Sequence, residues 1–240
     1  MNPPEPTATR PMSFFDHLEE LRRRIFYSLI ALGVAALAGW FVSAPLLEFL
    51  TRPVTRLVFL APAEAFTTQL KVALIAGALI AAPVILYQFW RFVRPALLPR
   101  EAGSIALAVV SGTLFFFGGF AFAYFAALPV GLRFLLGFET PRLEPMLSIG
   151  RYVGFATGIM LAFGIVFQMP VVLFFLTKLG IVTPRLLWKN QRLAVLIIVI
   201  AAAVFTPPDV VSQMLMAIPM LVLYELSILG SWLAARGRRG

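Results

Sequence analysis

Long uncharged segments are the feature of this sequence that most restricts its fold. The first, Ile25 to Leu47, contains 23 residues and no charged side chain. A run of about 18 or more apolar residues is long enough to cross a bilayer as a helix. The 240-residue chain is 60% hydrophobic and 13% charged, with a mean hydropathy of +0.92. The sequence therefore predicts an all-α integral membrane protein and argues against a soluble domain.

Six apolar runs are candidates for membrane-spanning helices. The fifth has 13 residues, which makes about 20 Å of helix against a hydrocarbon core of about 30 Å. The sixth is also expected to be short, with 15 residues before Glu225. Pro83 and Pro170 fall inside the second and fourth runs, where a proline usually kinks a helix. The expected spans are about 25–43, 72–90, 104–128, 152–177, 193–205 and 210–232.

The segments between the runs differ in charge. Acids and bases balance in the expected loops 44–69 and 129–149, whereas 91–101 and 178–192 are basic. Six crossings place both termini on the side of the basic segments, and 14 of the 20 Lys and Arg residues lie there. Because cytoplasmic loops are enriched in Lys and Arg, we expect both termini in the cytoplasm. The membrane domain, 13–233, would be flanked by a flexible tail, 1–12, and a basic tail, 234–240.

A charged segment, His17 to Arg24, directly precedes the first span, and five of its eight residues are charged. Asp16, Glu20 and Arg24 are each four residues apart and would share one face of a helix. The arginines are explained by the orientation of the chain in the membrane. Glu20 is not, because acids contribute little to orientation. An acid at the membrane boundary is well placed to receive a cation.

Two polar residues lie inside predicted spans, where the cost of burial makes them candidates for function. Gln168 is in the fourth span and Glu225 in the sixth. The structural explanations are an interhelical hydrogen bond for Gln168 and an ion pair of Glu225 with a base such as Arg192. Thr206 and Gln213 flank the turn between the last two spans, where polar side chains usually serve the turn backbone.

Several classes of function are excluded by missing motifs. The chain has no Cys and one His, so it offers no disulfide, thiolate site or His-based metal site. It has no phosphate-binding loop, zinc-protease motif or nucleophile elbow, so we expect neither enzymatic activity nor a cofactor. The net charge is +9, but the bases are scattered between apolar runs, which argues against nucleic acid. Energy for any work would come from the membrane gradient or a partner protein.

Four motifs follow one another along the chain. They are His17–Arg24; Ala82–Trp90 with Phe92, Pro95-Ala96-Leu97 and Glu101; Ala162-Phe163-Gly164 through Pro170; and Thr206–Val210 with Ser212-Gln213 and Ala217–Met220. In this order and on these sides of the membrane, they resemble the TatC family, the core subunit of the twin-arginine protein translocase. The resemblance covers about residues 14–233. It implies a concave cup of six helices in the bacterial cytoplasmic membrane.

The resemblance also implies a function and a set of site residues. Members receive signal peptides with paired arginines on folded proteins and export them with the proton-motive force. Family acids in the first motif and first cytoplasmic loop bind the arginines, and they match Glu20 and Glu101 here. Many relatives carry glutamate where this chain has Gln168, an amide that does not titrate. Further peptide-binding residues implied by the resemblance are Arg22, Arg24, Phe92 and Pro95.

The resemblance implies partners as well. The single-span subunits TatA and TatB are expected to dock along the fifth and sixth spans, near Thr206, Asp209 and Gln213. Contact with membrane lipid and self-association in the complex are also expected.

Two other classes of function stay open from the residues alone. A gradient-driven small-molecule transporter would place its site at mid-membrane on broken helices. Pro83, Pro170 and Gln168 favour it, whereas the short last spans and the lack of inverted-repeat symmetry argue against it. A purely structural membrane subunit would leave Glu20 and Glu101 unexplained.

Overall fold

Helices account for most of the chain in the computed structural model, which describes residues 14–54, 56–93, 104–137, 146–206 and 209–236. In chain order they are α1 (Phe14–Thr51), α2 (Pro62–Val93), α3 (Ser104–Phe122), the π-helical segment η3 (Ala123–Ala127), α4 (Leu128–Leu136), α5 (Ile149–Val166), α6 (Met169–Lys178), α7 (Pro184–Lys189), α8 (Gln191–Phe205) and α9 (Val210–Arg236).

Six crossings can be built from these helices. Five are long and apolar enough to span a membrane: α1, α2, α3 through α4, α5 with α6, and α9. The remaining crossing is α8, which is the fifth in chain order. It is apolar but has only 15 residues, and the fifth span was predicted to be short. The prediction of an all-α, multi-pass membrane protein is therefore confirmed. A short last helix is not observed, because α9 continues past Glu225 and reaches 27 residues.

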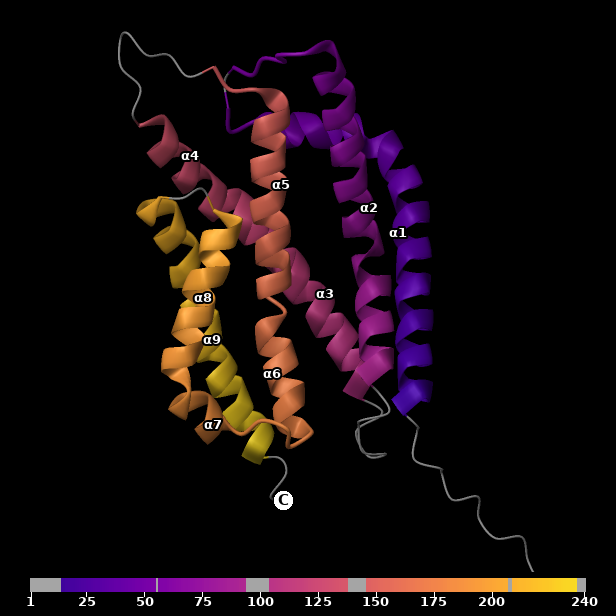
Figure 1. Cartoon of the computed structure of the whole chain (residues 1–240), viewed down its shortest axis with the longest axis vertical. Helices are drawn as coiled ribbons and strands as arrows, with labels where there is room; N and C mark the ends of the chain where they lie inside the picture. Colours follow the sequence, from indigo (N-terminus) through magenta and orange to yellow (C-terminus); the bar gives the residue numbers. More distant parts are fainter. Residues whose placement is uncertain (1–13, 55, 94–103, 138–145, 207–208, 237–240) are drawn as a thin grey trace, which may run out of the picture.

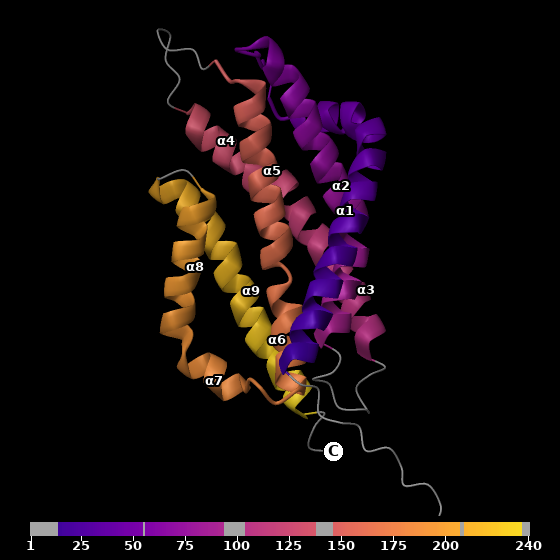
Figure 2. The ribbon, with the colours of Figure 1, turned by 45° about the vertical axis from the view of Figure 1, so that its right-hand side comes forward.

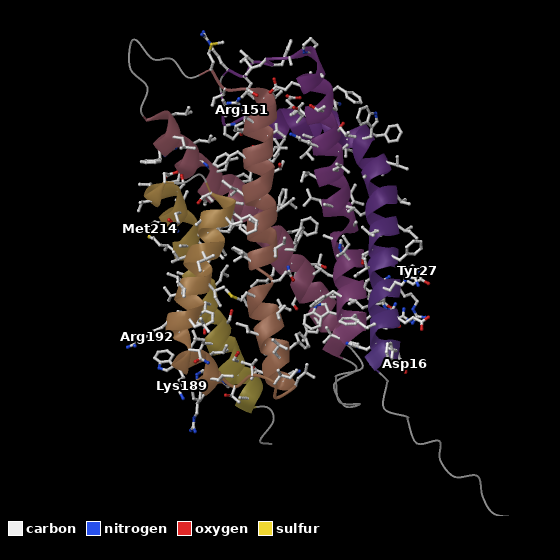
Figure 3. The ribbon with its side chains drawn as sticks, in the orientation of Figure 1. Asp16, Tyr27, Arg151, Lys189, Arg192 and Met214 are labelled. Carbon is white, nitrogen blue, oxygen red and sulfur yellow. The ribbon has the colours of Figure 1, made fainter. Side chains whose placement is uncertain are left out.

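The crossings are arranged around α5 and α6 (Figures 1 and 2). Helices α1 and α2 form one flank, α8 and α9 form the other, and α3 with α4 crosses obliquely. The start of α1 and the end of α9 lie at the same end of the bundle. Lys189 and Arg192 lie at the end that Asp16 occupies, and Arg151 at the opposite end (Figure 3). From the predicted excess of bases we call the first end cytoplasmic and the other outer.

Helix α2 begins at Pro62, within the expected loop 44–69. Two other helices also extend into segments where loops were expected, which corrects those predictions. Helix α1 passes through Pro45 and ends at Thr51. The third crossing continues through η3 and α4 to Leu136. Both extensions pack into the core, where Leu50 and Leu128 are fully buried. Burial of these apolar side chains outweighs the local preference of proline for a helix break.

Two tyrosines close the outer end of α1. The last carbonyl groups of a helix lack partners within the helix and need them elsewhere when buried. The Tyr124 hydroxyl, in η3, donates to the Phe49 carbonyl oxygen over 2.6 Å, and the Tyr152 hydroxyl, in α5, donates to that of Leu50 over 2.7 Å. These bonds tie α1 to the third crossing and to α5.

Helices α1 and α2 touch backbone to backbone. A Cβ atom placed on Gly39 would lie 2.4 Å from the Ala73 carbonyl oxygen, and one on Gly77 would lie 2.5 Å from Ala36 Cα. Small residues allow this close approach, which is a common mode of helix association in membranes. The contact fixes the register between the two helices and thereby positions the side chains at their cytoplasmic ends.

Glu64 joins the two outer loops, a role that the sequence did not reveal. Its Oε1 atom accepts hydrogen bonds from the Ser148 hydroxyl and from Gly150 N at 2.9 Å, and its Oε2 atom accepts one from Leu60 N at 2.6 Å. Beside it, Val58 pairs with the backbone around Ser148. Glu64 lies in the first turn of α2, ahead of the apolar stretch that begins at Val72. The Ser148 hydroxyl and the Leu60 and Gly150 N–H groups lower the pKa of Glu64 to about 2.

We predict that Glu64→Gln lowers the thermal stability of the protein at neutral pH, because an amide oxygen accepts these bonds less strongly than a carboxylate. The folded-state pKa of Glu64, about 2, lies below the ordinary value of 4.5. Its contribution to stability is therefore fully present above about pH 4.5 and is lost as the pH falls towards 2. Unfolding temperatures in detergent should fall less steeply over this range in the variant. Glu48→Gln, at an exposed site in α1, is the control, and equal pH profiles for Glu64→Gln and wild type would contradict the prediction.

Candidate functional site

Glu20 lies in the first turns of α1, and its two carboxylate oxygens are bound by two arginines one turn further along the helix. Arg24 donates two hydrogen bonds to Glu20 Oε1, the one from Nε measuring 2.7 Å, and Arg23 donates to Oε2. The Glu20 side chain is 11% exposed and that of Arg24 is 8% exposed, whereas that of Arg23 is 56% exposed. One arginine therefore forms an inner, fixed partner of the carboxylate and the other an outer partner within reach of solvent.

Contacts from α2 hold this turn in place. Arg24 also donates from a terminal nitrogen to Gln88 Oε1 over 3.1 Å. The His17 and Phe92 rings stack with their centroids 4.5 Å apart and an interplanar angle of 27°. The structure thus brings Phe92 beside the helix that carries Glu20. Gln88 and His17 lie within the recognised motifs, but their contacts depend on the register between α1 and α2, which no local pattern encodes.

A cavity of about 530 Å³ opens beside Glu20. Asp16 lies at the cytoplasmic end of α1 (Figure 3). Partial burial disfavours the charged form of Glu20, but the hydrogen bonds and charges of Arg24 and Arg23 outweigh it and lower the pKa of this carboxyl group. Glu20 is therefore an anion at neutral pH, in a geometry that accepts guanidinium groups. The cavity is lined by Asp16, Glu19, Glu20, Arg22, Arg23 and Phe26.

The other residues that the resemblance implies for peptide binding are placed differently. Arg22 is exposed and lines the cavity. Arg24 is buried and holds Glu20, so it positions the acid. Glu101 and Pro95 lie outside the described residues.

Gln168 lies at the break between α5 and α6. Pro170 has no N–H to give to the Val166 carbonyl, and the helix is interrupted at Phe167 and Gln168. The Gln168 Nε2 atom donates to the Gly112 carbonyl oxygen in α3 over 2.9 Å. The expected interhelical hydrogen bond is therefore present. Pro83 has no such effect, and α2 runs through it without interruption.

The polar residues of the last two crossings form two separate groups. At the outer turn, the Thr206 hydroxyl donates to Ala202 O over 2.8 Å, and Gln213 Nε2 donates to Val199 O over 3.1 Å. Asp209 Oδ1 accepts from Ser212 N over 2.7 Å and caps α9, while its Oδ2 is buried without a partner among the described residues. Near the cytoplasmic end, Glu225 accepts from Gln191 Nε2 over 2.9 Å; the suggested pairing with Arg192 does not occur. Within the described ranges, no three His, Asp or Glu side chains are grouped to hold a metal ion.

Comparison with known proteins identifies the class of protein. A family model described as Sec-independent protein translocase protein (TatC) matches residues 16–219. A TatC protein of Carboxydothermus hydrogenoformans is 42% identical over 224 residues, covering 91% of this chain and 92% of its own. That of Aquifex aeolicus is 39% identical, covering 95% and 98%. A crystal structure of the twin-arginine translocase receptor TatC superimposes with a TM-score of 0.83 at 39% identity, covering 91% of this chain and 99% of that chain.

The chain is thus a multi-pass subunit of a Sec-independent protein translocase in the cytoplasmic membrane, a transport component. It belongs to the TatC family. The predicted resemblance is confirmed, and the class of gradient-driven small-molecule transporters is set aside.

We predict that Gln168→Leu destabilises the protein by about 0.5–1.5 kcal/mol, because it removes a hydrogen bond between crossings and leaves the Gly112 carbonyl with one partner fewer. Gln168→Glu loses the same donor to Gly112 O, but it is expected to be tolerated because the loss is offset elsewhere. The buried Trp90 Nε1 lies beside Gly112 without a partner among the described residues and can donate to a carboxylate. Chemical unfolding in micelles measures both effects. Gln191→Leu serves as the control for a bond at the exposed end of a helix, and a Gln168→Leu protein as stable as wild type would reduce Gln168 to ordinary packing.

Proposed function

We propose that this chain is the receptor of its translocase, and that it binds the paired arginines of a signal peptide at Glu20. The observation that carries the proposal is the Glu20 carboxylate, which already accepts guanidinium N–H groups on both oxygens. Carboxylates bind guanidinium in a planar, bidentate manner that lysine does not reproduce. The site thus has the chemistry that a pair of arginines requires.

In this proposal, Arg23 occupies the position on Glu20 that an arginine of the peptide would take. It is the exposed partner of Glu20, whereas Arg24 is buried and also bound to Gln88. An arginine of the peptide would replace Arg23 on Glu20 Oε2, exchanging one charged hydrogen bond for another. The acids Asp16 and Glu19 line the same cavity and would attract the peptide's positive charge.

The remaining parts of the receptor follow from the family. Glu101 would bind the second arginine, with Pro95 shaping its loop and Arg22 contributing at the cavity. Phe92, stacked on His17, would contact the apolar part of the peptide. TatA and TatB would join the complex, several copies would assemble in the membrane, and the proton-motive force would drive transport of the folded cargo.

We predict that Glu20→Gln and Glu101→Ala each weaken binding of a twin-arginine signal peptide by about ten- to a hundredfold. Hydrogen bonds to charged groups contribute about 1.5–3 kcal/mol, and about 1.4 kcal/mol corresponds to a tenfold change. Binding of a labelled peptide to the protein in nanodiscs measures the loss, and a peptide with lysines in place of arginines should bind wild type more weakly.

Two further variants separate recognition from structure. Glu19→Gln lies in the same cavity and should weaken binding far less than Glu20→Gln, because it removes a long-range attraction and no proposed hydrogen bond to the peptide. Arg23→Ala should bind the peptide at least as tightly as wild type, because it frees Glu20 Oε2. Wild-type affinity in both Glu20→Gln and Glu101→Ala, with discrimination against lysine intact, would place recognition elsewhere.

The docking of TatA and TatB along the last crossings is supported by the surface of α8. This helix presents a row of exposed apolar side chains, among them Ile197, Ile200 and Val204. It is the short crossing, and its outer end meets the polar turn of Thr206 and Gln213. A single apolar helix laid against α8 would cover this row.

We predict that Val204→Cys forms crosslinks with a cysteine in the membrane helix of TatA or TatB, because Val204 is 74% exposed on α8. The chain has no native cysteine, so the introduced thiol is the only one. Leu37→Cys, 73% exposed on α1, is the matched control and should crosslink far less. Equal crosslinking at both sites would mean that α8 has no special role in docking.

A further inference from the structure

An apolar groove of about 450 Å³ lies between α3, α6 and α9, away from the Glu20 cavity. Its polar group is internally satisfied, since the Ser111 hydroxyl donates to Leu107 O over 2.7 Å. The groove therefore offers nothing to a polar solute and suits a hydrocarbon chain. It is lined by Leu107, Ser111, Phe115, Pro170, Val171, Phe174, Phe175, Leu226 and Gly230.

The groove lies in one half of the membrane. Its residues on α3 begin at Leu107, close to the cytoplasmic start of that helix, and end at Phe115, about 12 Å further along at about 1.5 Å per residue. Leu226 and Gly230 belong to the second half of α9, whose last turns lie at the cytoplasmic end of the bundle (Figure 1). Half of a hydrocarbon core about 30 Å thick is about 15 Å, so the groove matches the depth of the cytoplasmic leaflet.

A cation lies next to two rings that line this groove. The Lys178 Nζ atom, at the cytoplasmic end of α6, lies 5.5 Å from the Phe174 ring centroid and 5.9 Å from that of Phe175. Within the described part of the chain, the ion pairs are those of Glu20 with Arg23 and Arg24, so Lys178 has no acidic partner there. The following segment, through residue 192, contains bases and no acid. The positive charge of Lys178 is therefore available to an external anion.

We propose that this groove binds one anionic phospholipid of the cytoplasmic leaflet, with an acyl chain along α3, α6 and α9 and the phosphate at Lys178. The depth of the groove favours an acyl chain over a membrane helix. Its lining on α3 covers about 12 Å, close to one leaflet, whereas a membrane helix extends through both leaflets. The ammonium at the level of the headgroups, which has no acidic partner among the described residues, favours an anionic lipid over a zwitterionic one.

The test uses the purified protein in nanodiscs with a photoactivatable acyl chain on phosphatidylglycerol or, in a parallel sample, on phosphatidylethanolamine. Crosslinks mapped to the peptides of α3, α6 and α9 report occupancy of this groove. Competition between the two lipids should show phosphatidylglycerol favoured about fivefold, the factor expected from one lysine near an anionic headgroup. Soluble glycerol phosphate should not compete, because it lacks the chain.

Two pairs of variants locate the interaction. Lys178→Gln should abolish the preference for phosphatidylglycerol, and Lys189→Gln, on α7, should retain it. Gly230→Leu should block the groove for both lipids, because a Cβ atom there meets nothing within 4 Å and the side chain has room to enter. Gly33→Leu, at an equally open glycine of α1, is its control.

Three results would overturn the proposal. One is an unchanged lipid preference in Lys178→Gln, and another is undiminished crosslinking in Gly230→Leu. The third is displacement of the lipid from the groove by a saturating signal peptide or partner helix, which would assign the groove to that occupant. Folding of each variant is checked by its unfolding temperature, so that loss of crosslinking is not confused with loss of structure.

Discussion

The structure depends on the requirement that backbone polar groups inside a membrane be satisfied within the protein. This requirement favours unbroken helices, and α1 and the third crossing remain helical through Pro45 and Pro129, where burial of Leu50 and Leu128 outweighs the effect of the prolines. Where the helices end or break, side chains supply the missing partners. Tyr124 and Tyr152 donate to carbonyl groups at the end of α1, and Gln168 links the break after α5 to α3.

The close contact of α1 and α2 positions the side chains of the candidate peptide site. Gly39 and Gly77 let the backbones touch, and the resulting register places Gln88 against Arg24 and Phe92 against His17. Arg24 is buried, and an unpaired buried charge is costly, so Glu20 and Gln88 stabilise the fold as well as the site. Glu20 thus holds Arg24, which in turn binds Gln88 of α2, while its second carboxylate oxygen accepts from the exposed Arg23. In the proposed receptor, Arg23 would occupy Glu20 Oε2 until an arginine of the peptide replaces it.

The two flanks of the bundle serve different contacts. The flank of α1 and α2 carries the acidic site at the cytoplasmic surface, whereas α8 offers an exposed apolar row and a polar outer turn. Between them lies the groove of α3, α6 and α9, with Lys178 next to two of its lining rings. The three surfaces differ in chemistry. The site on α1 presents carboxylates, α8 presents apolar side chains alone, and the groove combines apolar side chains with a nearby cation. A signal peptide, a membrane helix and an anionic lipid match these surfaces without competing for one of them.

The sequence by itself determined the fold class, the six crossings and the family, because these depend on hydropathy over long windows and on motifs that are contiguous in the chain. It also singled out Glu20 and the hydrogen bond of Gln168 as features that local chemistry requires. It failed at the ends of helices, where α1 reaches Thr51 and α9 passes Glu225, because burial against other helices overrides charge and proline as stop signals. Only the tertiary structure decided that Arg23 and Arg24 take different roles on Glu20 and that Glu64 joins two outer loops. It also decided that Lys178 lies beside the rings of a groove, without an acidic ion-pair partner among the described residues. The physical reason is that these arrangements depend on the register and crossing of helices far apart in the chain, which are set by packing and are invisible to any local pattern.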